Sequence, residues 1–200
     1  MINNFVEIFT KPTSFFKSIK HWSYPDVLRF LFTILFLPYL LYFYVSTGIE
    51  DGFTNLLFLL SIIVSLLVVF VGPFAGALIT HIGVLIMGGE GYKKTFLATG
   101  NSIVVTSPYL LASALLMLTA VQGNNITFLI LSLITWLIML GGWIHALVAE
   151  VIGLKVMHKF DTFKAIIAAL VIPLAISLLL IIILVFVIAL GVLLFSFTLY

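Results

Sequence analysis

Residues 165–199 read AIIAALVIPLAISLLLIIILVFVIALGVLLFSFTL, an apolar run without a charged side chain. Such a run is typical of a transmembrane helix, since about 20 residues of α-helix cross the hydrocarbon core of a bilayer. Four further apolar runs precede it, at residues 27–46, 53–87, 95–121 and 126–153. The sequence therefore predicts an all-α polytopic membrane bundle with about five transmembrane helices.

The composition of the whole chain supports this fold class. Of 200 residues, 64% are hydrophobic and 8% are charged, whereas a soluble domain is roughly half apolar and about a quarter charged. Five spans of about 20 residues leave little chain for anything else, so we interpret residues 1–200 as a single membrane domain. Cysteine is absent, which excludes disulfides and catalytic thiols.

The basic residues predict the orientation in the membrane. All nine precede or open the first span, or lie in the second or fourth connection: Lys11, Lys17, Lys20, Arg29, Lys93, Lys94, Lys155, Lys159 and Lys164. Because Lys and Arg are enriched in cytoplasmic loops, we expect the N-terminus in the cytoplasm and the C-terminus outside. Four or six spans would divide these charges between the two sides. A net charge of +2 without a basic stripe argues against nucleic acid as a partner.

Residues 1–26 combine aromatic and basic side chains. We expect this segment to lie in the cytoplasmic interface, with its aromatic and aliphatic side chains in the headgroup layer and its lysines near anionic lipid. The apolar members are Phe5, Phe9, Phe15, Phe16, Ile19 and Trp22. Its lysines, Lys11, Lys17 and Lys20, fall short of the roughly four to eight basic residues of a dedicated phosphoinositide site, so the segment is interpreted as an ordinary juxtamembrane anchor.

Two of the runs are too long to cross a bilayer as straight helices. The run 165–199 would measure about 50 Å as a helix, against a hydrocarbon thickness of about 30 Å. Proline removes a backbone donor and clashes with the preceding turn. We therefore predict breaks or kinks at Gly72-Pro73 and at Pro173, and similar kinks at Pro38 and Pro108.

Ionisable side chains inside a membrane are candidates for function because their burial is costly. Three are predicted in the cytoplasmic half of the second and fourth spans, at depths that allow them to meet: His81, His145 and Glu150. Rows of small residues predict close helix packing around the histidines. The row beside His81 consists of Gly72, Gly76 and Thr80, and the row of His145 consists of Gly141, Ala149 and Gly153.

Three interpretations of these polar residues stay open. In the structural one, the histidines form hydrogen bonds across helices and Glu150 pairs with a lysine such as Lys155. In the second, the group relays protons or ions. The third is a zinc site, which the sequence does not favour, since His145 and Glu150 point about 140° apart around a helix.

Three stretches carry a family resemblance. Residues 81–111 read HIGVLIMGGEGYKKTFLATGNSIVVTSPYLL, residues 136–145 form a Trp-rich part of the fourth span, and residues 154–173 read LKVMHKFDTFKAIIAALVIP. Together with Lys11-Pro12 followed by Phe15-Phe16, they resemble the Yip domain family (Ypt-interacting protein family), which consists of five-helix membrane proteins with a cytoplasmic N-terminus. About 26 residues precede the first span, so the chain is most similar to short prokaryotic-type members.

The resemblance implies a role but no chemistry. Eukaryotic members are associated with vesicle trafficking, Rab-type GTPases and membrane shaping, and without a long cytoplasmic arm we do not expect GTPase recruitment. We expect a non-enzymatic membrane scaffold, or a trafficking or membrane-organisation factor, in the cell membrane. It should act through helix packing and contacts with lipids, other membrane proteins or a second copy of itself, and we expect no cofactor, catalytic residue or metal. The alternative is a small proton, ion or metal transporter that uses His81, His145 and Glu150.

Overall fold

The computed structural model describes residues 2–46, 54–121 and 125–198. Within these ranges the chain is helical and contains no β-strand. Five helical stretches are long and apolar enough to cross a membrane: Tyr24–Val45, Phe58–Ile86, Tyr92–Ala120, Asn125–His158 and Thr162–Ala189. The predicted all-α bundle with five spans is confirmed, whereas the orientation of the termini stays a prediction. The connection predicted at 47–52 lies outside the described residues, as do residues 122–124 of the connection predicted at 122–125, whereas Asn125 is the first residue of the fourth span.

Most spans consist of more than one helix. The first span is α3 (Tyr24–Ser46), and the second joins α4 (Thr54–Phe70) to α5 (Gly72–Ile86). The third comprises α6 (Tyr92–Ser102), the 3-10 segment η2 (Ile103–Thr106) and α7 (Ser107–Val121). The fourth is the single helix α8 (Asn125–His158), and the fifth comprises α9 (Thr162–Ile166), the π-helical segment η3 (Ile167–Val171) and α10 (Ile172–Thr198).

The helix breaks lie close to three of the prolines. Pro73 stands in the first turn of α5, directly after the turn at Val71, where its missing N–H is not needed. η2 ends just before Pro108, and η3 ends just before Pro173. A π turn or a 3-10 turn rearranges the hydrogen bonds that proline interrupts. α3 continues through Pro38 as one helix.

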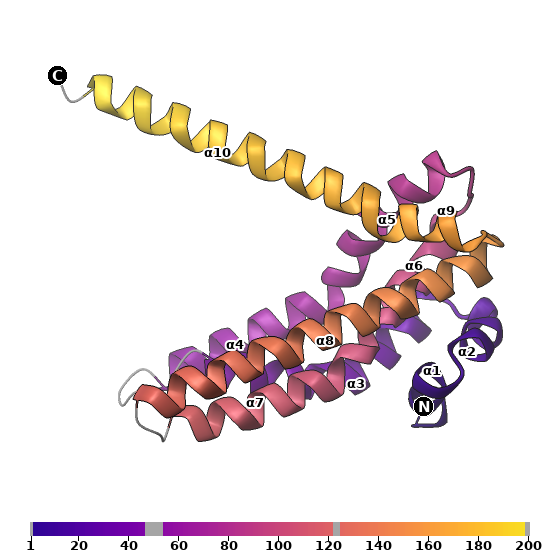
Figure 1. Ribbon diagram of the computed structural model, residues 1–200, viewed down its shortest axis with the longest axis horizontal. Helices are drawn as coiled ribbons and strands as arrows, with labels where there is room; N and C mark the ends of the chain where they lie inside the picture. The colour runs from indigo at the N-terminus through magenta and orange to yellow at the C-terminus, as the bar shows by residue number, and fades with distance from the viewer. Residues whose placement is uncertain (1, 47–53, 122–124, 199–200) are drawn as a thin grey trace.

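The bundle is built around α8. This helix packs along α6 and α7, while α3 packs against α4 and α7 (Figure 1). α5 changes direction after α4 and lies against α6, η3 and the start of α10 (Figure 1).

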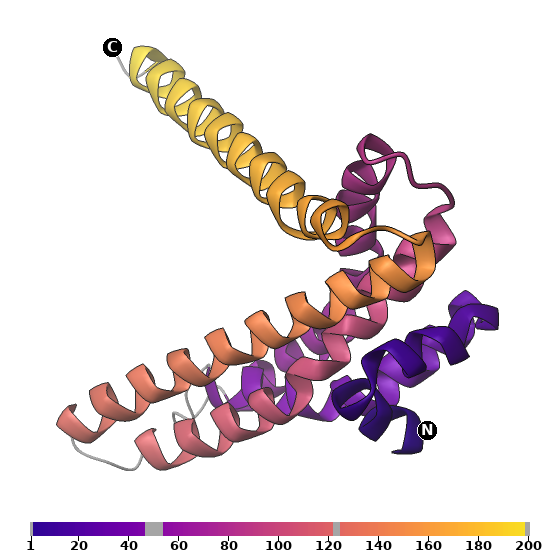
Figure 2. The same ribbon diagram turned by 45° about the vertical axis from the view of Figure 1, so that its right-hand side comes forward.

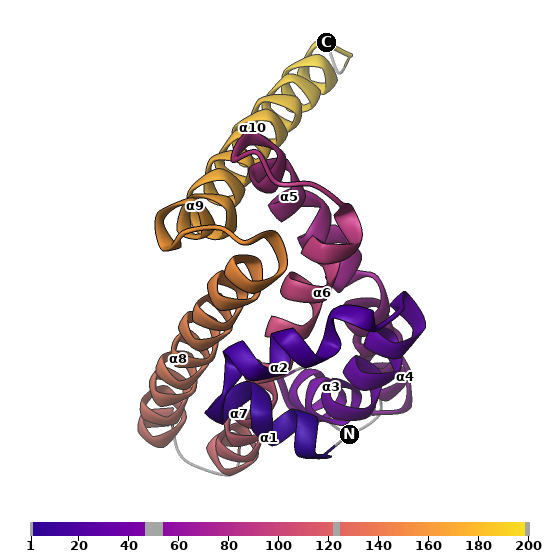
Figure 3. The same ribbon diagram turned by 90° about the vertical axis from the view of Figure 1, so that its right-hand side faces the viewer.

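The N-terminal segment folds back onto the protein. It consists of α1 (Ile2–Thr10), α2 (Pro12–Ser18) and η1 (Ile19–His21), and α2 packs on α8 (Figure 3). Phe15, Phe16 and Ile19 are at most 1% exposed, so the expectation that they enter the headgroup layer is wrong. The reason is a gap between helices: an added Cβ at Gly153 would lie 2.9 Å from the Phe16 ring, so the ring fills the space that glycine leaves.

The C-terminal helix α10 leaves the bundle. It contacts chiefly α5 and η3 near its beginning and then diverges from α8 (Figures 1 and 2). Every residue from Leu178 to Ile188 is 49–65% exposed. The most apolar span, with a mean hydropathy of 3.4, is therefore the one that the rest of the protein covers least.

Candidate functional site

Polar side chains from three spans meet between α5, α6 and α8. One carboxyl oxygen of Glu150 on α8 accepts hydrogen bonds from the hydroxyl of Thr80 on α5, at 2.9 Å, and from that of Thr99 on α6, at 2.7 Å. Both threonines are buried. A single acidic group therefore ties three helices together.

A second group lies beside it on the same three helices. Nδ1 of His81 is 2.9 Å from the hydroxyl oxygen of Thr95, and that oxygen is 3.1 Å from Nε2 of His158. A hydroxyl has one proton, so Thr95 can donate to at most one of the two imidazoles, and at least one imidazole N–H must donate to Thr95. The tautomers of the two histidines are thereby coupled. We refer to the two groups together as the polar seam: Thr80, His81, Thr95, Thr99, Glu150 and His158.

His145 lies outside the polar seam. Its Nδ1 is 3.0 Å from the hydroxyl of Tyr109 on α7, and its ring meets the ring of Phe9 on α1 at a centroid distance of 5.4 Å. The structure thus places His81 and Glu150 in the polar seam, where they bond to different threonines, and it places His145 apart from them. In the part of the chain that the structure describes, no group of three or more His, Cys, Asp or Glu residues is placed to hold a metal ion.

The expected pairing of Glu150 with Lys155 is also wrong. Glu150 is bonded to threonines, and the Lys155 ammonium donates to the Thr162 hydroxyl at 2.8 Å. The fourth span was expected to end at Gly153, but α8 continues to His158. Lys155 is therefore a helical residue that faces α9, and His158, expected in a connection, belongs to the polar seam. The buried Leu154 and Met157 continue the apolar pattern of the span and are the signal for this extension.

Two close helix contacts depend on glycines outside the predicted rows. An added Cβ would lie 2.7 Å from the backbone oxygen of Ala168 at Gly83, and 2.9 Å from the ring of Tyr109 at Gly142. α5 therefore approaches η3, and α8 approaches α7, at distances that only glycine allows.

Three of the predicted packing glycines have more room. An added Cβ would lie 3.6 Å from Thr99 at Gly76, 3.6 Å from Tyr109 at Gly141, and 4.0 Å from Val68 at Gly72. These are ordinary contacts. Gly153, the last residue of the predicted row of His145, does make a tight contact, since an added Cβ would lie 2.9 Å from the Phe16 ring. The rows of small residues thus mark the correct helices and one of the tight contacts, whereas Gly83 and Gly142 lie at neighbouring positions.

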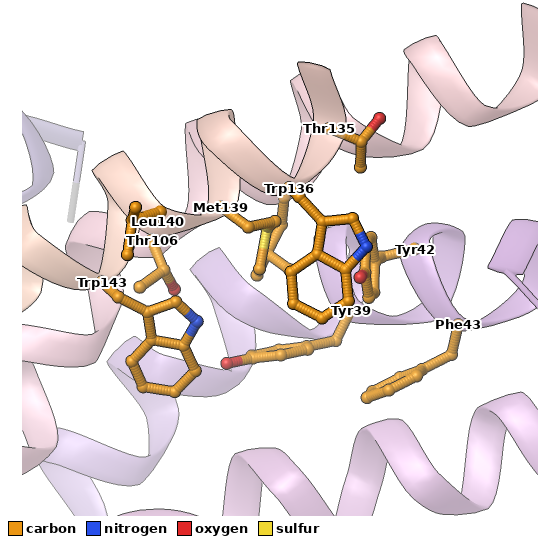
Figure 4. A pocket seen from close by; sticks show the side chains of 10 residues that line it. Tyr39, Tyr42, Phe43, Thr106, Thr135, Trp136, Met139, Leu140 and Trp143 are labelled. Carbon is orange, nitrogen blue, oxygen red and sulfur yellow. The ribbon is translucent and has the colours of Figure 1, made fainter. Parts of the chain in front are cut away.

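An aromatic pocket lies on the other half of the bundle. It encloses about 380 Å³ between α3, α8 and the third span. Figure 4 shows Trp136 on α8 above Tyr39 on α3, with Trp143 on the left of Tyr39 and Phe43 on its right. The two tryptophans are 76% and 61% exposed. The lining suits an apolar chain, and the pocket is separate from the polar seam.

Comparison with known proteins gives one match. The family model described as the Yip1 domain matches residues 6–200, a range that includes all five spans and the whole polar seam. No curated protein and no solved structure matches the chain.

Proposed function

This chain belongs to the Yip1 domain family, and from that premise we propose that it is a non-enzymatic scaffold of the cell membrane. It organises the membrane through helix packing and through contacts with lipids and other membrane proteins, including a second copy of itself. It is an integral, multi-pass membrane protein with five spans. The finer role rests on two features of the structure.

The uncovered helix α10 carries the proposal. Lipid tails are as apolar as leucine, so nothing drives an apolar helix onto its own bundle unless small or polar residues favour packing. From Leu178 to Ile188, α10 carries only large apolar side chains, so it has none of the small or polar residues that favour packing, and each side chain is about half exposed. Such a helix presents its surface to whatever neighbours it in the membrane, which is what a scaffold requires.

The polar seam supports a structural role for the intramembrane polar groups. Hydroxyl, carboxyl and imidazole groups bond to one another across α5, α6 and α8. Hydrogen bonds of this kind hold transmembrane helices together. The seam fixes α5, and α5 in turn contacts η3 and the start of α10, so it sets the direction in which α10 leaves the bundle.

Photocrosslinking tests the scaffold proposal. Because the chain has no cysteine, a cysteine introduced at Ile182, which is 65% exposed on α10, is the only site for a maleimide-benzophenone label. A matched control is Leu115 on α7, which is 64% exposed. In native membranes we expect protein adducts at Ile182 and markedly fewer at Leu115. The same yield at both sites, with a monomeric protein that leaves reconstituted vesicles unchanged, would contradict the proposal.

One observation favours a second candidate function, proton transfer. The hydrogen bonds run from His81 through the Thr95 hydroxyl to His158. When a proton binds one imidazole, the hydroxyl can pass a proton to the other imidazole, which then releases it, and rotation of the hydroxyl restores the starting state. A proton transporter would show flux in proteoliposomes that falls when His158→Gln or Glu150→Gln is introduced. Absence of flux in the unmodified protein removes this candidate.

A further inference from the structure

A hollow lined by lysines lies where α2 and α8 end. It encloses about 450 Å³, and four of its lining residues are basic: Lys17, Lys20, Lys155 and Lys159. A lysine in the last turn of a helix is expected, since it complements the helix dipole. The convergence of two helix ends goes beyond that expectation, because it places four lysines around one space whose lining contains no carboxylate.

The positive charges around this hollow have no negative counterpart among its lining residues. The Lys155 ammonium donates to the Thr162 hydroxyl, whereas the ammonium groups of Lys17, Lys20 and Lys159 make no hydrogen bond or ion pair with the residues that the structure describes. Like charges gathered around one space repel each other. An anion in the hollow would remove that repulsion and give each ammonium group a partner.

The backbone at Lys159 points to the same site. Lys159 has φ 56 directly after the last residue of α8, a left-handed conformation in which glycine or asparagine is usual at helix ends. The position thus combines a strained backbone with a side chain that lines the hollow.

An apolar groove continues from the hollow. Ile152 and Lys155 line both, and the groove runs between α8 and the α9–η3 segment with a volume of about 400 Å³. Its other lining residues are mostly aliphatic: Leu147, Val148, Val151, Thr162, Ile166 and Leu170. A cationic end joined to an apolar channel matches an amphiphilic ligand with an anionic head.

We propose that an anionic phospholipid occupies this site, with its phosphate among the four lysines and one acyl chain in the groove. The inference rests on the proposed function, because it assigns a place to the lipid contacts of the scaffold. It also extends the sequence analysis: the N-terminal segment alone is short of basic residues, and α8 with the residue after it supplies Lys155 and Lys159. Basic pockets between helices on the cytoplasmic side bind lipid headgroups in this way.

Native mass spectrometry of the full chain in detergent tests the proposal. We expect palmitoyl-oleoyl phosphatidylglycerol to bind at least about ten-fold more tightly than the phosphatidylcholine with the same chains, because two lysine contacts at a factor of about five each already exceed that ratio. Lys159→Asn should lower the affinity for phosphatidylglycerol about five-fold. Asparagine accepts the left-handed backbone, so this loss cannot come from a misfolded helix end.

Two controls sharpen the result. Lys93→Gln and Lys164→Gln remove exposed lysines outside the hollow and should leave the affinity unchanged. Val148→Phe fills the groove and should weaken phosphatidylglycerol without changing the binding of inorganic phosphate.

Three outcomes would overturn the assignment: equal binding of the two lipids, unchanged binding in Lys159→Asn, or inorganic phosphate that binds as tightly as phosphatidylglycerol, which would indicate a free-phosphate site. None of these affects crosslinking from α10, so failure of the lipid site and failure of the scaffold are distinguishable.

Discussion

The N-terminal segment, α1 to η1, and the C-terminal helix α10 are both rich in large apolar side chains, but they stand in opposite relations to the bundle. Phe15 and Phe16 are completely buried, whereas Phe186 on α10 is 65% exposed. In water, apolar side chains are driven together. Inside a bilayer, close fit and polar contacts decide which helices pack, and the glycine gap at Gly153 gives Phe16 such a fit. Hydropathy therefore indicates which segments enter the membrane, but not which of them the protein buries.

The largest effect is expected from a pair of phenylalanine truncations that tests this contrast. Phe16→Ala removes a fully buried ring and should lower the free energy of unfolding by about 3–5 kcal/mol. Phe186→Ala removes a ring that is 65% exposed and should change it by less than about 0.5 kcal/mol. The measurement is unfolding of the purified protein in mixed detergent and SDS micelles. Equal losses in the two variants would mean that α10 is covered as thoroughly as the N-terminal segment.

A second pair concerns the short part of the fifth span that does touch the bundle. Gly83→Ala would place a Cβ 2.7 Å from the Ala168 backbone oxygen, so α5 and η3 must separate, at a cost of about 1–3 kcal/mol. Gly72→Ala meets only Val68 at 4.0 Å and should be neutral. The same unfolding measurement distinguishes them. A neutral Gly83→Ala would show that α5 does not hold the fifth span.

A third, smaller effect is expected in the polar seam, which links α5 to the buried part of the molecule. Thr99→Val removes one of the two hydroxyls that donate to Glu150 and should lower the free energy of unfolding by about 1 kcal/mol. Thr119→Val is the matched control, because its hydroxyl donates to Leu116 within its own helix. If both variants are equally stable, the seam contributes nothing to packing.

The sequence predicts the elements of this fold much better than their contacts. Hydropathy and the distribution of lysines predict five spans because both follow from the bilayer itself. The partners of Glu150 and His81 are threonines, Thr99 and Thr95, which are among the commonest polar residues in membrane helices and carry no distinguishing pattern. His158 falls in the predicted connection because Lys155, Lys159 and Lys164 make residues 154–164 a polar segment between two apolar runs, although the buried Leu154 and Met157 continue the span. Partners of this kind depend on helix rotation, which a weakly amphipathic, apolar helix does not specify in its sequence.

The smallest expected effect tests whether α10 is alone in the membrane. Ile182 is 65% exposed, so Ile182→Ala should change the free energy of unfolding of the detergent-solubilised monomer by less than about 0.5 kcal/mol. Steric trapping can repeat the measurement on protein in native lipid vesicles. If a second protein covers α10 there, Ile182→Ala should lower the free energy of unfolding by more than about 1 kcal/mol in vesicles, because the truncation then leaves a cavity in the interface between the two proteins. In detergent, where that interface is absent, the free energy of unfolding should stay the same. A neutral result in both media would mean that lipid alone surrounds this helix, and the contrast between the two ends of the chain would then hold in the membrane as well.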